Sequence, residues 1–119
     1  MTAKSAAPIV YGIPNCSSVK NARTWLSDQG LAYEFHDFKK QGVPEAALEA
    51  WMASAGWQTV LNRKGTSWRQ LDSATQAGVT DAASARRVIL QQPSLIKRPV
   101  IQWPSGRITI GYQPEHWPA

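Results

Sequence analysis

The chain of 119 residues contains one cysteine and two histidines. With Cys16 alone, no disulfide can form within the chain, and His36 and His116 lie too far apart for the usual ligand spacing of a zinc site. The sequence also lacks an apolar run near the roughly 18 residues of a membrane-spanning helix, and its opening residues are too polar for a signal peptide. These absences predict a cytoplasmic protein without a metal, whose thiol stays reduced.

Acidic residues are scarce: eight against thirteen Lys and Arg, which gives a net charge of +5. Such an excess suits an anionic substrate, a nucleic acid or simply a solvated surface. The basic residues are spread along the chain without the aromatic and basic motif of an RNA-binding module, so we expect no direct nucleic-acid binding. With 43% hydrophobic residues, the chain is expected to fold unaided as one domain over residues 1–119.

The N-terminal part of the sequence is typical of a strand–helix–strand unit. A short β-branched and aromatic run over 9–13, closed by a proline and an asparagine, predicts a buried strand. Apolar residues at helical spacing predict an amphipathic helix over roughly 16–29, with Gly30 at the position of a C-terminal cap. Alternation of apolar and polar residues over 31–36 then predicts a half-buried strand.

The rest of the sequence predicts helices followed by a β-hairpin. Helices are expected over 45–55, over 67–77 and from an N-cap at Thr80-Asp81 to before Pro93. Two β-rich runs, 99–103 and 107–112, surround a Pro-Ser-Gly turn. Because the crossover makes the first two strands parallel and the hairpin adds an antiparallel pair, we expect a mixed sheet flanked by helices, with a helical insertion over about 43–93.

Tryptophan is abundant, with six residues. Five of them lie on or beside apolar faces, and core packing explains them better than ligand stacking: Trp25, Trp51, Trp57, Trp68 and Trp103. The sixth, Trp117, has no place in the predicted elements.

Cys16 is the residue best placed for chemistry. It follows a predicted strand and begins a predicted helix, where unpaired N–H groups and the helix dipole favour an anion over a neutral thiol. Lys20, four residues further on, is expected on the same side of the first turn and would add a positive charge. A lone cysteine can also be a small buried hydrophobe. The junction position favours a partly exposed thiol that is more acidic than a free cysteine.

Two further patterns are notable. Arg98 stands directly before Pro99, which opens an apolar strand although proline cannot donate to a strand ladder. A cis peptide bond would explain this proline, although cis bonds are a minority of such bonds. The second pattern is the basic stretch 62–69, which on composition alone is a solvated turn.

Three separated segments together resemble the ArsC/Spx/YffB family, most closely its YffB branch. They are Tyr-Gly-Ile-Pro-Asn-Cys-Ser-Ser-Val-Lys-Asn-Ala (11–22), Asn-Arg-Lys-Gly-Thr-Ser-Trp-Arg (62–69) and Pro-Ser-Leu-Ile-Lys-Arg-Pro-Val (93–100). The likeness covers about residues 8–112. It implies a thioredoxin-like α/β fold with a helical insertion, and a cis bond at Pro99.

The resemblance also implies a chemistry. In arsenate reductases of this family one cysteine attacks arsenate, glutathione attacks the adduct and glutaredoxin regenerates the enzyme, and Cys16 matches that cysteine. Of the three arginines that hold the oxyanion there, Arg69 matches the one after a Gly-x-Ser-x pattern and Arg98 the one before the cis proline. The third would fall near Gly111 and is missing, and Lys20 stands where those enzymes have arginine.

Fewer guanidinium groups should loosen arsenate binding, because each offers a planar fork to an oxyanion and lysine only a point charge. We therefore expect a glutathione-dependent thiol reductase or transferase with no bound cofactor, glutathione as co-substrate and glutaredoxin as a partner. The expected site comprises the nucleophile, three anion-binding residues and two structural residues: Cys16; Lys20, Arg69 and Arg98; Asn15 and Pro99.

Two alternatives stay open, a genuine arsenate reductase and an Spx-like regulator that binds RNA polymerase. Redox-sensing members of the Spx branch usually carry a C-x-x-C pair, whose second position is Val19 here, so an internal disulfide switch cannot form. Arg86 and Arg87 could face a protein partner, although a solvated helix face explains them better. The regulator is therefore the less favoured reading.

Overall fold

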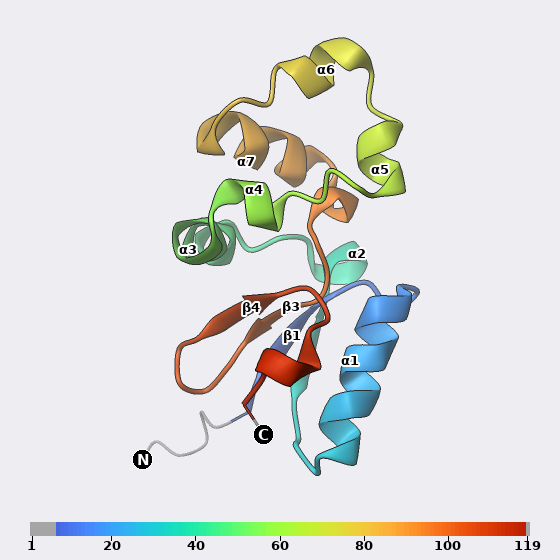
Figure 1. The fold of residues 1–119 in the computed structure, drawn as a ribbon, viewed down its shortest axis with the longest axis vertical. Coiled ribbons are helices and arrows are strands. Elements are labelled where there is room, and N and C mark those ends of the chain that lie inside the picture. The colour runs from blue at the N-terminus through green and yellow to red at the C-terminus, as the bar shows by residue number, and fades with distance from the viewer. Residues whose placement is uncertain (1–6, 119) are drawn as a thin grey trace. The chain divides into compact units, whose positions relative to one another are not determined.

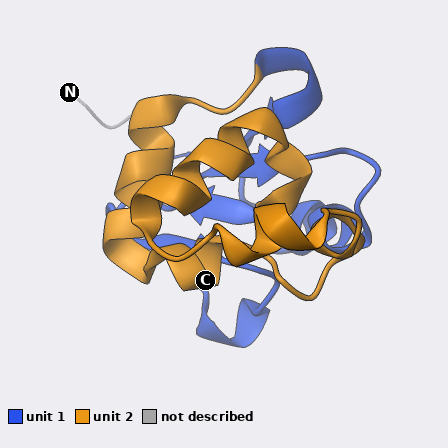
Figure 2. Cartoon of the chain, turned by 90° about the horizontal axis from the view of Figure 1, so that it is seen from above, with its two compact units in different colours: residues 1–41, 98–119 blue, residues 42–97 orange. Residues whose placement is uncertain are grey.

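Residues 7–118 are described by a computed structural model, in which the chain divides into two compact units. The first unit contains the chain up to residue 41 and again from residue 98, and the second contains residues 42–97 (Figures 1 and 2). That residues 1–119 behave as one domain stays a prediction. Within residues 7–118, no helix has the length and apolar character needed to cross a membrane.

The first unit is built on a four-stranded mixed sheet in the order β2-β1-β3-β4. β1 pairs in parallel with β2, whereas β3 is antiparallel to both β1 and β4. This arrangement confirms the predicted crossover and hairpin. The elements of this unit are β1 (Ile9–Gly12), α1 (Ser17–Asp28), β2 (Glu34–Asp37), α2 (Phe38–Gln41), β3 (Val100–Gln102), β4 (Ile108–Ile110) and the 3-10 turn η3 (Pro114–His116).

Helix α1 packs on this sheet through the apolar stripe that its sequence predicts. Ala22 and Leu26 are fully buried and join Val10 of β1 and Ile101 of β3 in one core cluster. Burial of a side chain the size of Val10, Leu26 or Ile101 contributes about 1.5–3 kcal/mol. The helix ends as predicted, with Gly30 at a φ of +73°, a backbone conformation that glycine adopts without strain.

The second unit consists of helices and turns. Its elements are α3 (Glu45–Ala55), α4 (Trp57–Val60), α5 (Thr66–Arg69), α6 (Ser73–Ala77), α7 (Ala82–Gln91) and the 3-10 turn η2 (Pro93–Leu95). The bounds of α3 agree with the prediction. Asp81 caps α7 as predicted, because its carboxylate accepts the Ser84 N–H at 2.9 Å and the Ser84 hydroxyl accepts the Asp81 N–H at 3.1 Å.

Two predicted elements differ from the structure, and two short helices had no counterpart in the prediction. The helix expected over 67–77 is two short helices, α5 and α6, because the backbone is extended at Asp72 and α6 starts anew there. The strand expected over 31–36 begins only at Glu34, since the Leu31 N–H is still bonded to the Leu26 carbonyl of α1. These unpredicted helices are α2, which follows β2 directly, and α4.

The tryptophans are mostly in or beside the two cores, as predicted. Trp51 is fully buried and Trp103 is 4% exposed, while Trp25 packs against the core cluster of the first unit. Trp57 and Trp68 are half-buried. Trp117, which the sequence left without a place, is also buried.

Candidate active site around Cys16

Cys16 lies at the junction between β1 and α1. It is the N-cap residue of α1, with extended backbone angles of φ −99° and ψ 129°. A tight turn leads into it, because its N–H donates to the Ile13 carbonyl at 3.2 Å. The strand end must approach the helix closely, since a Cβ added at Gly12 would lie 2.6 Å from Cγ2 of Val19. Glycine at the end of the strand therefore permits the turn that holds the thiol.

The surroundings of the thiol favour its charged form. Burial raises the pKa of the half-buried Cys16 thiol, but several contacts act in the opposite direction. The Val19 N–H, the hydrogen bond and positive charge of Arg98 and the Ser18 N–H all lower the pKa, and the net result lies below its ordinary value. The half-buried position and the lowered pKa agree with the expectation from the sequence. At neutral pH more of the thiol is the nucleophilic thiolate than in free cysteine.

The positive charge at the thiol comes from Arg98, where the sequence suggested Lys20. Lys20 is exposed on α1, and its contact with Cys16 is the helical bond from its N–H to the Cys16 carbonyl at 2.9 Å. Arg98 reaches the thiol from the residue pair that leads into β3. The Arg98–Pro99 peptide bond is cis, as predicted, and Pro99 is buried with its carbonyl bonded to the Gly111 N–H at 2.8 Å.

Replacing Arg98 by alanine should make the thiol less acidic and less reactive. Arg98 lowers the pKa of Cys16, so its removal raises that pKa and shifts the inflection of iodoacetamide alkylation to higher pH. The thiolate fraction at neutral pH then falls, but a thiolate of higher pKa is the stronger nucleophile and offsets part of this loss, so reaction with glutathione disulfide should slow about three- to tenfold. Lys20→Ala removes a neighbouring cation and should leave the alkylation profile in place. An unshifted profile in Arg98→Ala would contradict this account of the thiol.

Two of the other predicted site residues are exposed. Asn15 lies in the turn directly before Cys16, and its structural role there stays a prediction. Arg69 ends α5 in the second unit, where its guanidinium donates to the Lys64 carbonyl at 2.7 Å. Its place in an anion site also stays a prediction. No group of three or more His, Cys, Asp or Glu side chains that could hold a metal ion occurs within residues 7–118.

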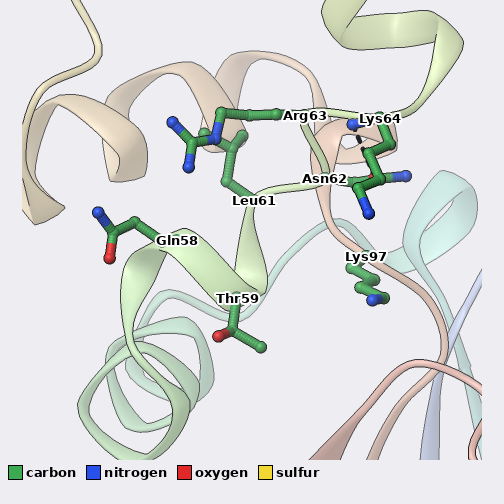
Figure 3. Close-up of a pocket in the computed structure, with 7 residues that line it drawn as sticks. All are labelled: Gln58, Thr59, Leu61, Asn62, Arg63, Lys64 and Lys97. Carbon is green, nitrogen blue, oxygen red and sulfur yellow. Dashed lines mark hydrogen bonds between the residues drawn. The ribbon is translucent and has the colours of Figure 1, made fainter.

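The basic stretch 62–69 contributes to a pocket of the second unit, and its Arg63, Lys64 and Arg69 are exposed, as composition alone suggested for a solvated turn. Two backbone bonds of 2.8 Å, from the Asn62 N–H to the Leu95 carbonyl and from the Lys97 N–H to the Val60 carbonyl, hold distant segments together. A pocket of about 250 Å³ is lined by residues of the 58–64 segment and by Lys97 (Figure 3). The described residues that line it include three cationic side chains and no carboxylate: Gln58, Thr59, Leu61, Asn62, Arg63, Lys64 and Lys97.

Comparison with known proteins agrees with this architecture. A solved structure of a YffB protein is 47% identical, with a TM-score of 0.86, and the match covers 92% of this chain and 94% of that one. An arsenate reductase (ArsC) related protein from Brucella melitensis is 41% identical, with a TM-score of 0.73, over 92% of this chain and 89% of that one.

A more distant relative is the global transcriptional regulator Spx of Streptococcus agalactiae serotype V, which is 26% identical over 83% of this chain and 72% of its own length. The structural matches confirm the predicted thioredoxin-like α/β fold. The sequence model of the ArsC family matches residues 11–119, which include the Cys16 turn and the Arg98–Pro99 pair. The chain belongs to the ArsC family.

Proposed function

We propose that the protein is a glutathione-dependent thiol reductase or transferase in which Cys16 is the single nucleophile. The observation that carries the proposal is the contact of the Cys16 thiol with Arg98 and with the N–H groups of Ser18 and Val19, which together favour the thiolate. The sequence has no second cysteine, so an adduct on Cys16 must be resolved by an external thiol. Glutathione is the abundant thiol that fits this requirement.

The proposed reaction has two exchange steps. The Cys16 thiolate attacks the glutathione sulfur of a mixed disulfide between glutathione and a substrate. A bond forms between the Cys16 and glutathione sulfurs, the substrate–glutathione bond breaks, and the substrate leaves as a thiolate that takes a proton from water. A second glutathione thiolate then attacks the adduct, releases glutathione disulfide and restores Cys16. The substrate gains two electrons, which come from glutathione, or from glutaredoxin where that protein removes the adduct.

Arsenate is a poorer substrate in this proposal. The third oxyanion-holding arginine of the arsenate reductases would fall near Gly111, which is buried and has a φ of +90°. An arginine at Gly111 itself would be strained in this left-handed conformation. An oxyanion beside Cys16 therefore lacks one guanidinium fork, whereas attack on a disulfide does not require it.

The test is whether Cys16 accepts glutathione and gives it up again. Purified protein is treated with glutathione disulfide, and mass spectrometry of the intact chain and of its peptides should show one glutathionyl group on Cys16. Addition of glutathione and glutaredoxin should then remove it, and arsenate in the same coupled assay should be turned over weakly or not at all. A Cys16 that stays unmodified, or an adduct that these thiols leave in place, would reject the proposal.

The Spx relative supports a second candidate function, binding of RNA polymerase. The position of a second C-x-x-C cysteine is occupied by Val19, which is fully buried. Because a valine cannot form a disulfide, such a function would operate here without an internal disulfide. A pull-down with RNA polymerase separates the two functions, because a thiol reductase needs no such complex.

A further inference from the structure

A hollow of about 330 Å³ lies beside the Cys16 turn within the first unit. Figure 1 shows α2 close to the N-terminal end of α1, and the two walls of the hollow come from these neighbouring parts of the chain. One wall is the turn that leads into Cys16 and the other is the end of β2 with α2: Ile13, Pro14 and Asn15; Asp37, Lys39 and Lys40.

The sheet register places this hollow next to the nucleophile. β1 and β2 are parallel, with Gly12 opposite Asp37, so both strands end at the same edge of the sheet. The turn to Cys16 leaves β1 at that edge, and α2 leaves β2 there. Two segments far apart in the sequence therefore flank the hollow, one carrying the thiol and the other carrying two lysines.

The charges of the hollow favour an anion. The Asp37 side chain is turned to the backbone, since it accepts the Lys39 N–H at 2.8 Å and the residue is only 8% exposed. Lys39 and Lys40 are exposed, and within residues 7–118 neither forms an ion pair with a carboxylate. Their ammonium groups are thus available to a ligand, while Asp37, the carboxylate among the described lining residues, accepts a backbone hydrogen bond through its Oδ1.

We propose that this hollow binds a carboxylate of the glutathione molecule that is joined to Cys16, with Lys39 and Lys40 supplying the charge. The inference rests on the proposed function. Both carboxylates of glutathione lie within about two residue lengths, roughly 7 Å, of its own cysteine. Asn15, in the wall of the hollow, is the residue next to Cys16, so a carboxylate of the bound tripeptide can reach the lysines. Arg98 remains at the thiol itself.

The experiment compares an anionic and an uncharged disulfide. The second-order rate constant of Cys16 with glutathione disulfide is divided by that with hydroxyethyl disulfide at pH 7, for the wild type and for Lys39→Gln/Lys40→Gln. The ratio should fall about fivefold, the size expected for two exposed charge interactions. The rate with hydroxyethyl disulfide should not change, because this reagent has no carboxylate.

A matched control is Lys64→Gln/Lys97→Gln in the basic pocket of the second unit. Both glutamine double variants lower the net charge from +5 to +3, but the control should keep the wild-type ratio of rate constants. Lys39→Arg/Lys40→Arg should also keep this ratio, because it retains both positive charges. An unchanged ratio in Lys39→Gln/Lys40→Gln, or an equal fall in the control, would overturn the inference. The proposed function would survive either result, because Cys16 would still react with both disulfides. Failure of wild-type Cys16 to react with either disulfide would overturn the proposed function and this inference with it.

Discussion

Replacement of Cys16 by serine is expected to abolish glutathionylation and to lower disulfide reduction at least about a thousandfold, as loss of a covalent nucleophile does in other enzymes. A serine hydroxyl cannot form a disulfide, and at neutral pH it stays protonated even beside Arg98. Because the sequence has no other cysteine, no second thiol can take over. The measurement is the rate of glutathione disulfide formation in a coupled assay with a glutathionylated peptide as substrate.

The stability of this variant shows that the loss is chemical. Cys16 is the N-cap of α1, and its thiol lies at the Ser18 and Val19 N–H groups, from which a capping side chain accepts. Serine is a preferred N-cap, so Cys16→Ser should be as stable as the wild type or more stable by up to about 1 kcal/mol. Ser17→Ala, at the exposed neighbouring position, serves as the control that keeps activity. Turnover by Cys16→Ser near the wild-type rate would show that another group performs the reaction.

Local patterns were sufficient to predict most of the elements. The apolar spacing of α3 and the Asp81 cap of α7 are properties of neighbouring residues, and the structure reproduces both. The division between α5 and α6 depends on side chains that compete with a continuous helix. Asp72 accepts a hydrogen bond from the Thr75 hydroxyl, and Gln76 donates to the Trp68 carbonyl at 2.8 Å. The helical spacing of apolar residues gives no sign of these competing hydrogen bonds.

The candidate site was predicted in part for a similar reason. The strand and helix around Cys16 are consecutive, so the sequence alone places the thiol at their junction. The cation beside it depends on the pairing of β1 with β3, in which Tyr11 lies opposite Val100. That register brings Arg98 to the turn, and only the family resemblance pointed to it. Spacing along a helix could suggest no more than Lys20.

Trp117 is the largest residue whose place the sequence did not reveal. It is 7% exposed and belongs to the core cluster of the first unit with Val10 and Ile101. Its ring lies 5.2 Å from that of Trp25 and 5.7 Å from that of Trp103, measured between centroids. It follows η3 and contacts elements that are distant in the sequence, so no periodic pattern could assign it.

Truncation of Trp117 to alanine is expected to lower the free energy of unfolding by about 3–5 kcal/mol, the usual cost of removing a buried aromatic side chain. Trp117→Phe should cost less than about 2 kcal/mol, because the phenylalanine ring keeps most of the contacts. The substitution also removes a buried indole N–H that has no hydrogen-bond partner among residues 7–118. Urea unfolding followed by circular dichroism measures both changes.

Amide hydrogen exchange at Val10 and Ile101 locates the effect of the Trp117 substitution. Exchange at these buried strand positions should accelerate strongly in Trp117→Ala. Trp57→Ala removes a half-buried tryptophan from the second unit and serves as the control. Exchange at Val10 and Ile101 should be slower in Trp57→Ala than in Trp117→Ala. If Trp117→Ala stays within about 1 kcal/mol of the wild type, Trp117 does not hold the sheet and α1 together, since a buried indole that contributes to a core costs several times more to remove.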